Sequence, residues 1–255
     1  MRIRSLLCCI LFSLFACLPT FADTQVKPLR VGMFTEFEPL VFLISAEIQG
    51  VEVDFARLVS EALGRPLEIE TLPFAELIPA LTANRIDVVM SGLSVTRERQ
   101  KRVNYTDPYM EIGQMAIVRL EDAQSLGKLN ALTKDGLKIG VQIDTTGEAY
   151  VRRSYRTANV LPYIGVESGL QALREGNIQV FVHDSTTSWQ LGRSFVNDNL
   201  ISLNKFLTRE SIAWAVRKED QDLLIAINLV LERLKAEGRV NEVLNRWLPQ
   251  VRVAS

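Results

Sequence analysis

Hydrophobic and polar residues in the first half of the chain are spaced as in alternating strands and helices. Apolar or alternating runs at 29–33, 67–72 and 86–90 predict strands. Between them, apolar residues recur at helical spacing over 54–63 and again over 74–83. This βαβαβ order predicts a mostly parallel sheet covered by helices, and the β-branched run at 86–90 predicts a strand buried on both faces.

The same alternation begins again further along the chain, so we expect a second α/β unit. No low-complexity linker separates the two units, and we therefore expect extended crossing segments to join them. Strands are predicted at 115–119, 138–142, 178–182 and 212–216, and helices at 167–175, 185–191, 223–234 and 243–247.

The first residues have the pattern of a secretory signal. Arg2 and Arg4 precede an apolar stretch over 6–18 that is too short to cross a bilayer. A small-residue cleavage site ends at Ala22. We expect residues 1–22 to be a signal peptide and the remaining chain to be exported to the periplasm.

All three cysteines lie in this first segment, at Cys8, Cys9 and Cys17. The exported part contains none, so its folding cannot depend on disulfide bonds. An alternative for Leu14-Phe15-Ala16-Cys17 is a lipoprotein box, although its phenylalanine is atypical. In that case a lipid on Cys17 would anchor the mature chain by its first residue.

Composition and charge exclude several classes of function. The 255 residues carry 29 Lys and Arg against 30 Asp and Glu, a net charge of −1, so we expect neither nucleic acid nor an anionic membrane surface as a partner. The chain has one histidine and no HExxH, GxSxG or glycine-rich phosphate motif. We therefore expect a protein that is not an enzyme, without catalytic residues, metal or cofactor.

Six segments, taken in order, carry a resemblance that no single motif would support. They are LRVGMFTEFEPLVF, GVEVDFARLVSEALG, PFAELIPALTANRIDVVMSGLSVTRERQKRVNYTDPYM, KIGVQIDTTGEAY, ALREGNIQVFVHDS and AVRKEDQDLLIAINLVLERLKAEGRVNEVLNRWL. From about Leu29 to Leu248 the chain resembles the bacterial extracytoplasmic solute-binding proteins of family 3, the polar amino-acid-binding proteins of ABC transporters.

The resemblance implies an α/β, two-lobed fold like that of the type II periplasmic binding proteins. Each lobe would be a mostly parallel sheet flanked by helices, with two hinge strands crossing between the lobes and a small ligand held in the cleft. Lobe 1 would comprise 27–110 and 212–251, and lobe 2 would comprise 111–211. The crossings would lie near 109–113 and 208–212.

A bound α-amino acid needs opposite charge at both of its ends, because its carboxylate and its ammonium are buried together. Arginine suits the carboxylate, since its planar fork binds two oxygens. Gly92, Ser94 and Arg99 follow the strand 86–90, at the edge where open α/β sheets bind ligands. The resemblance assigns all three to the ligand site, with Arg99 on the carboxylate. Residue type alone favours a solvated surface charge for Arg99.

Asp184 also follows a buried strand. Plain N-capping of the next helix would explain a carboxylate there, whereas the resemblance implies that Asp184 receives the ligand's ammonium. Thr145 and Thr146 follow the strand 138–142, and N–H groups at a helix start would complete the carboxylate site. Arg99 and Thr146 would then hold the ligand from opposite lobes, which favours the closed state.

Aromatic side chains are expected to line the rest of the site. Phe37 and Phe74 fall where the family places the rings that sandwich the ligand's side chain, although lone phenylalanines at such positions are more often core residues. Phe34 stands where many members carry an aspartate. His183, the only histidine, either contacts the ligand or is a structural residue beside Asp184.

The segment after the first strand departs from the family pattern. Glu36, Glu38 and Leu40 replace commoner small or aromatic residues around Pro39. Together with Phe34, these changes predict a pocket with one apolar wall and acidic groups near its mouth. Such a pocket suits an aromatic, aliphatic or cationic side chain, the last through cation–π contact, and argues against an ordinary glutamine-like ligand.

Three functions remain open at this point, each with a small-molecule ligand and an expected monomer. The favoured one is a binding protein that captures an amino acid, or a related amine-bearing acid, for an ABC importer with an inner-membrane permease. The second is a receptor that reports the ligand to a sensor kinase or another partner. The third is a dehydratase of the cyclohexadienyl type, in which Glu36, Glu38 or Glu148 would have to donate a proton.

Overall fold

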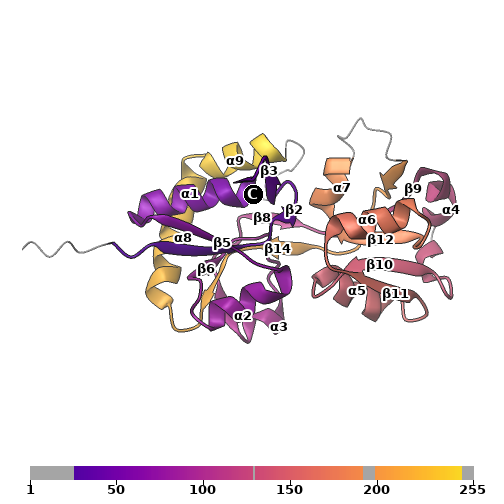
Figure 1. Cartoon of the computed structure of the whole chain (residues 1–255), viewed down its shortest axis with the longest axis horizontal. Coiled ribbons are helices and arrows are strands. Elements are labelled where there is room, and N and C mark those ends of the chain that lie inside the picture. Colours follow the sequence, from indigo (N-terminus) through magenta and orange to yellow (C-terminus); the bar gives the residue numbers. More distant parts are fainter. Residues whose placement is uncertain (1–25, 129, 192–198, 249–255) are drawn as a thin grey trace, which may run out of the picture.

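The computed structural model describes residues 26–128, 130–191 and 199–248. The expected signal peptide, including Cys17, lies outside the described residues. The chain forms two lobes side by side, joined by the antiparallel strands β8 (Met110–Ile112) and β14 (Glu210–Ile212) (Figure 1). The lobes have separate hydrophobic cores, as expected of two units that each fold around their own sheet.

A five-stranded sheet forms the centre of each lobe. The strand order is β5-β1-β6-β15-β7 in the first lobe and β11-β10-β12-β9-β13 in the second. The strands are β1 (Leu29–Met33), β5 (Leu67–Thr71), β6 (Val88–Val89), β7 (Val103–Tyr105), β15 (Ala215–Arg217), β9 (Gln114–Arg119), β10 (Lys138–Gln142), β11 (Asn159–Tyr163), β12 (Val180–Asp184) and β13 (Leu200–Ser202).

Within each sheet, one strand runs against the other four. The first three strands of each order are mutually parallel, whereas β15 and β9 are antiparallel to both of their neighbours. Both reversed strands follow a crossing strand in the chain, since β9 comes after β8 and β15 comes after β14. The hinge connections thus account for the reversed strands in the otherwise parallel sheets.

Helices cover the sheets on both faces. In the first lobe α1 and α9 lie on one side of the sheet and α2 on the other (Figure 1), and α8 packs against α1, α9 and β15. The helices are α1 (Val51–Leu63), α2 (Leu77–Thr82), α3 (Arg97–Gln100), α4 (Ala123–Leu126), α5 (Thr146–Ser154), α6 (Val166–Arg174), α7 (Ser185–Leu191), α8 (Gln221–Ala236) and α9 (Arg239–Trp247), with 3₁₀ turns η1 (Phe74–Glu76), η2 (Leu120–Asp122) and η3 (Ala131–Thr133).

Two predicted elements are divided in the structure. The helix expected over 74–83 begins as the 3₁₀ turn η1, because Pro79 has no N–H to continue an α-helical ladder back to residue 75. The strand expected over 212–216 is divided into β14 and β15, and between them the Trp214 N–H donates to Thr106 Oγ1 (3.1 Å). A small sheet of β2 (Glu36–Phe37), β3 (Val41–Ile44) and β4 (Glu47–Gln49) was not predicted.

Asp87 joins three arginines in the first lobe. Its carboxylate is 2% exposed and accepts hydrogen bonds from Arg30 (2.7 Å), Arg65 (2.9 Å) and Arg217 (3.3 Å). Burial acts to raise the pKa of Asp87, but the hydrogen bonds and charge of Arg30, together with Arg217, lower it to about 2. The ionised carboxylate is therefore a stabilising part of this lobe.

Replacing Asp87 by asparagine is expected to lower the free energy of unfolding by about 2–4 kcal/mol near neutral pH, because the arginines lose their shared counter-charge. The carboxylate's contribution is present above its unfolded pKa and is lost as the pH falls through its folded pKa of about 2. Urea unfolding should show the difference between wild type and D87N shrinking below roughly pH 4. D107N, at an exposed carboxyl, is the control; a difference that does not change with pH would contradict this account.

Candidate functional site

The predicted site residues come from both lobes and meet at the interface between them. Ser94 follows β6 in the first lobe, while Thr146 and Asp184 lie after β10 and at the end of β12 in the second. The two lobes touch here, because Arg99 Nη2 donates to the carbonyl oxygen of Asp144 across the interface (3.2 Å). The carboxyl ends of strands thus build this region, as in other open α/β sheets.

Arg99 extends from α3 toward the second lobe. Thr96 begins this helix by accepting the Arg99 N–H on its hydroxyl (3.1 Å). The guanidinium lies with its Cζ 5.4 Å from the ring centroid of Phe74, and it donates to the carbonyls of Ser94 (3.1 Å) and Asp144 (3.2 Å). Since a guanidinium has five N–H groups, Arg99 keeps donors for a carboxylate in addition to these two bonds.

Ser94 is buried and connects the arginine to the hinge. Its backbone pairs with Ile212 of β14, and its carbonyl accepts from both Arg99 Nη1 and Tyr105 Oη, each at 3.1 Å. Burial raises the pKa of Tyr105 to about 12 despite the opposing charge of Arg99, so the phenol remains a donor. The Ser94 hydroxyl has no hydrogen bond to another described residue and can bind a ligand.

Asp184 is a largely buried carboxyl with one close amide partner. Its Oδ1 accepts a short hydrogen bond from Nε2 of Gln114, the residue opposite it in β9. Burial and the nearby charge of Glu210 raise its pKa, while Gln114 and Arg99 lower it, and the result is about 7. A cation placed beside Asp184 would favour the ionised form.

The start of α5 presents two threonines in different roles. The Thr145 hydroxyl caps the helix, since it accepts from the Glu148 N–H (3.2 Å) and donates to the Gln142 carbonyl (2.7 Å). The Thr146 hydroxyl accepts from Gln114 Nε2 (3.2 Å). The first N–H groups of a helix have no acceptor within it, so this end of α5 suits a carboxylate.

Gly92 has a packing role at the interface. Its φ is +63°, and a Cβ there would lie 2.6 Å from Leu40 Cδ1 and 2.7 Å from Phe37 Cε1. The resemblance assigns Gly92 to the ligand site, and in the structure its N–H donates to the buried carboxylate of Glu52 (2.5 Å). The glycine therefore makes room for Leu40 and Phe37, and its N–H is already used.

Glu52 lies beneath this loop and connects it to both crossings. It is fully buried in the first turn of α1 and accepts from the Gly92 N–H, from Tyr109 Oη (2.8 Å) and from Trp214 Nε1 (2.8 Å). Burial raises its pKa against the opposing effect of these three hydrogen bonds. Tyr109 precedes β8 and Trp214 follows β14, so Glu52 fixes both hinge connections to the site loop.

The predicted aromatic residues form two ring-to-ring contacts, and one of the rings also lies against Arg99. Phe34 and Phe74 meet edge to face at 6.2 Å, and Phe74 also lies beneath the guanidinium of Arg99. Phe37 is 4% exposed and meets the ring of His183 across the interface at 5.4 Å and 88°. Each of the three phenylalanines thus contacts at least one other predicted site residue.

His183 is buried, and both of its ring nitrogens have protein partners. Nδ1 lies 2.8 Å from Thr187 Oγ1, and Nε2 lies 2.9 Å from Gln142 Oε1. Burial lowers the pKa of His183 to about 3, so the ring is neutral. This is the arrangement expected of a structural histidine.

Three residues of this region were not predicted: Gln114, Glu52 and Asp144. Gln114 begins a strand and Asp144 ends a strand–helix turn, where polar residues are ordinary and carry no signal of a site. Glu52 stands between Val51 and Val53 at the start of an amphipathic run. A carboxylate within such an apolar stretch was the one available indication of a buried acid.

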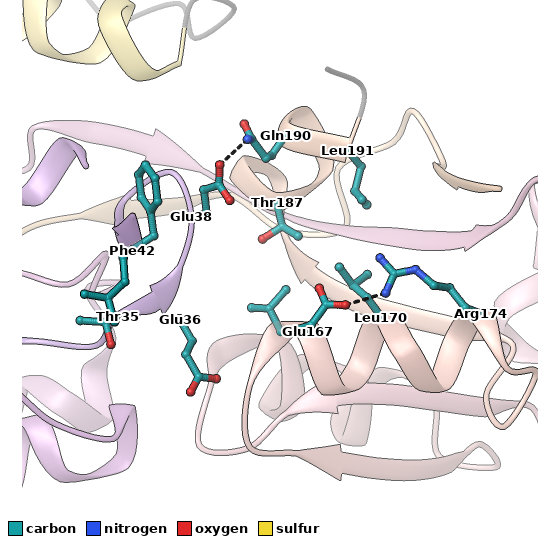
Figure 2. Close-up of a pocket in the computed structure, with 12 residues that line it drawn as sticks. Thr35, Glu36, Glu38, Phe42, Glu167, Leu170, Arg174, Thr187, Gln190 and Leu191 are labelled. Carbon is teal, nitrogen blue, oxygen red and sulfur yellow. Dashed lines mark hydrogen bonds and ion pairs between the residues drawn. The ribbon is translucent and has the colours of Figure 1, made fainter. Parts of the chain in front are cut away.

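A cavity of about 550 Å³, here called the interlobe cavity, lies beside this region (Figure 2). Glu36 and Glu38 approach it from the first lobe, and Glu38 accepts from Gln190 Nε2 (2.6 Å). Glu167 pairs with Arg174 (2.7 Å) on α6. The lining is acidic and includes neither Arg99 nor Asp184; it consists of Thr35, Glu36, Glu38, Phe42, Leu43, Val166, Glu167, Leu170, Arg174, Thr187, Gln190 and Leu191.

Membrane-spanning helices and metal-binding clusters are both absent from the described ranges. No helix there is long and apolar enough to cross a membrane. No three His, Cys, Asp or Glu side chains in those ranges gather as metal ligands would.

Comparison with known proteins assigns the chain to a family. Residues 29–250 match the bacterial extracellular solute-binding proteins, family 3, and the chain belongs to this family. The L-cystine-binding protein TcyJ of Escherichia coli (strain K12) is 26% identical over 220 residues, 86% of this chain and 82% of that protein. The predicted family resemblance is thus confirmed.

Solved structures agree with this assignment. An ancestral arginine-binding protein bound to arginine is 30% identical, covers 88% of this chain and 99% of its own, and has a TM-score of 0.82. The ancestral amino acid-binding protein AncCDT-1, a precursor of cyclohexadienyl dehydratase, is 27% identical, covers 87% and 95%, and has a TM-score of 0.80. The predicted two-lobed fold, with two strands crossing between its lobes, is confirmed.

Proposed function

We propose that this protein binds a free α-amino acid between its lobes and delivers it to an ABC importer. The observation that carries the proposal is a guanidinium from one lobe and a carboxyl from the other, Arg99 and Asp184, close enough to influence each other electrostatically. A zwitterion supplies a partner of opposite charge to both groups. The amino-acid-binding relatives in the same family support this assignment.

In this proposal each end of the ligand meets both lobes. Arg99 and the N–H groups at Thr146 bind the α-carboxylate, while Asp184 and the Ser94 hydroxyl bind the ammonium. Phe34, Phe37 and Phe74 line the side-chain pocket, with Gly92 making room for Phe37 and with Thr145 and His183 supporting the second lobe. We assign 27–110 and 212–251 to the first lobe and 111–211 to the second.

The test is a thermal-shift screen of the mature protein against the standard amino acids and L-cystine, followed by titration calorimetry of each hit. A ligand at 100 times its dissociation constant adds about 2.7 kcal/mol of stability, so a true ligand raises the melting temperature by several degrees. No shift with any amino acid at millimolar concentration would remove the proposal.

We favour an amino acid with a basic side chain. The interlobe cavity presents Glu36, Glu38 and Glu167 against the single guanidinium of Arg174, so its potential attracts cations. Among the solved relatives, an ancestral arginine-binding protein is bound to arginine in one structure and to glutamine in another, and its arginine complex supports testing arginine. Arginine is therefore the first ligand to test.

Replacing Glu36 and Glu38 by glutamine should weaken arginine binding by roughly three- to tenfold and glutamine binding by less than about twofold, since both carboxylates are partly solvated. The loss should shrink at high salt. Calorimetry with both ligands measures it, and E219Q/E237Q, which removes two exposed charges outside the cavity, is the matched control. Equal losses of affinity for arginine and for glutamine would contradict the proposal that the ligand has a basic side chain.

We propose that the chain acts in the periplasm after removal of residues 1–22, with a lipid on Cys17 as the less favoured alternative. A monomer that docks on an inner-membrane permease fits this role. A receptor that reports to a sensor kinase would use the same site. Neighbouring genes for a permease and an ATPase would favour transport over signalling.

Dehydratase activity is the second candidate, because AncCDT-1 is a precursor of such an enzyme. Three acids are candidate proton donors. Glu36 and Glu38 line the interlobe cavity, whose lining includes neither Arg99 nor Asp184. Glu148 already accepts hydrogen bonds from Arg152 (2.9 Å) and from the Asp144 N–H (2.8 Å). We therefore propose binding without turnover. Phenylpyruvate formation from prephenate would overturn this choice.

A further inference from the structure

Gln114 is a buried polar residue at the point where the chain enters the second lobe from the hinge. It is 1% exposed and is the first residue of β9, two residues after the crossing strand β8. Its side chain lies among the residues expected to bind the ligand, yet nothing in the sequence indicates that Gln114 belongs to the site. A buried amide is retained at such a place only if its hydrogen bonds are satisfied.

The side-chain amide of Gln114 holds two predicted ligand residues together. Its Nε2 donates to Asp184 Oδ1 and to Thr146 Oγ1 (3.2 Å), which uses both of its hydrogens. Its Oε1 occupies the space beside Gly147, where a Cβ would lie only 2.6 Å from it. With Asp184 ionised, its carboxylate only accepts hydrogen bonds, which agrees with the amide nitrogen facing it.

The backbone of Gln114 connects the same site to the second crossing. Its N–H donates to Thr208 Oγ1 (2.9 Å), and that hydroxyl donates to Glu210 Oε1 (2.6 Å) on β14. The other carboxylate oxygen of Glu210 is buried and has no hydrogen-bond partner among the described residues. A chain of hydrogen bonds therefore runs from the hinge carboxylate, through Gln114, to Asp184.

These groups act on Asp184 in opposite directions. Burial and the negative charge of Glu210 favour its neutral form, whereas the hydrogen bond from Gln114 and the charge of Arg99 favour the carboxylate. His183 on the same strand is neutral and does not contribute a charge. Gln114 is thus an uncharged group that both orients Asp184 and favours its ionised form.

We propose that Gln114 is a positioning residue of the amino-acid site, which holds the Asp184 carboxylate and the Thr146 hydroxyl in binding geometry and keeps Asp184 ionised against the charge of Glu210. This inference rests on the proposed function, because it presumes that Asp184 receives an ammonium. This role explains why a buried glutamine contacts Asp184 and Thr146 of the second lobe and is also connected to both hinge strands. A purely structural glutamine would support packing without affecting the ionisation of Asp184.

The test is a pH titration of the Asp184 side-chain carboxyl by ¹³C NMR in the ligand-free protein, with D184N to assign its signal. Q114L should raise the midpoint by at least about 0.5 pH units, and E210Q should lower it by a similar amount. Q114N, whose amide is one methylene shorter, should behave as Q114L does and serves if leucine impairs folding. Midpoints within about 0.2 units of wild type in the folded variants would overturn the inference.

Calorimetric titration with L-arginine separates this inference from the proposed function. If the proposal holds, the pH at which arginine affinity begins to fall shifts upward in Q114L together with the NMR midpoint. If wild type binds arginine, and if neither the NMR midpoint of Asp184 nor the pH at which arginine affinity falls changes in Q114L, only the proposed role of Gln114 is wrong. If wild type binds no amino acid in the screen, the proposed function fails, and the NMR midpoints still report whether Gln114 controls Asp184.

Discussion

Replacing Arg99 by alanine is expected to weaken binding of any α-amino acid by about 100- to 1000-fold, equivalent to roughly 3–4 kcal/mol. In the variant, the ligand's carboxylate would be buried without the guanidinium of Arg99. The variant also loses the bond from Arg99 to the Asp144 carbonyl that joins the lobes, so closure is weakened as well. Calorimetry with the best ligand from the screen measures the loss.

Two variants make this test specific. R99K keeps the charge but not the planar fork, and we expect it to retain part of the affinity, with a loss of roughly 10- to 100-fold. R97A removes an exposed arginine from the same helix and should bind as wild type does. An unchanged dissociation constant in folded R99A would remove Arg99 from the site.

The affinity for an amino acid is expected to fall on the acid side of neutrality. Asp184 has a raised pKa of about 7 in the ligand-free protein, so below that pH a proton must leave before the ligand's ammonium can bind. The dissociation constant should rise about tenfold between pH 8 and pH 6 and about 100-fold between pH 8 and pH 5. The ligand's own ammonium stays charged over this range, so the change reports the protein group.

D184N isolates the residue responsible. It should lose about 100-fold or more in affinity at pH 8, because a neutral amide cannot replace the buried carboxylate, and it should lose the pH dependence as well. D135N, at an exposed carboxyl of the second lobe, should keep both. A D184N protein that still shows the acid loss would assign the titration to another group.

Much of the fold could be predicted because its core elements repeat simple patterns. The strands 29–33 and 138–142 and the helix 185–191 have the expected bounds, since each has a hydrophobic pattern that matches its burial. In β12, Val180 and Val182 enter one core and Phe181 the other, as expected of a strand covered on both faces.

Other elements depend on contacts that local patterns do not record. The hairpin of β3 and β4 turns at Ser45 and Ala46, whose φ values of 49° and 67° come without the glycine or asparagine that normally marks such a turn. The third strand of the first sheet is shorter than its apolar run, since only Val88 and Val89 make ladder bonds to both neighbours. The β3–β4 turn and the length of β6 therefore depend on pairing with neighbouring strands and not on the local sequence pattern.

The candidate site likewise contains some residues that the sequence indicates and others that it does not. Arg99 and Asp184 could be placed near the ligand edge because each follows a buried strand. Their ligand roles came from the family resemblance and remain predictions, since residue type alone favoured a surface charge for Arg99 and allowed a helix cap for Asp184. The supporting residues Gln114 and Glu52 could not, because their importance lies in hydrogen bonds to residues far away in the chain. Glu52 bonds to Trp214, 162 positions further on, and Gln114 bonds to Asp184, 70 positions further on.

A crystal structure of the mature protein with its bound amino acid tests the central claim most directly. We predict that the ligand's carboxylate lies within hydrogen-bond distance of the Arg99 guanidinium and the N–H of Thr146, and that its ammonium contacts the carboxylate of Asp184. A ligand found elsewhere, for example in the interlobe cavity with no contact to either Arg99 or Asp184, would contradict the account.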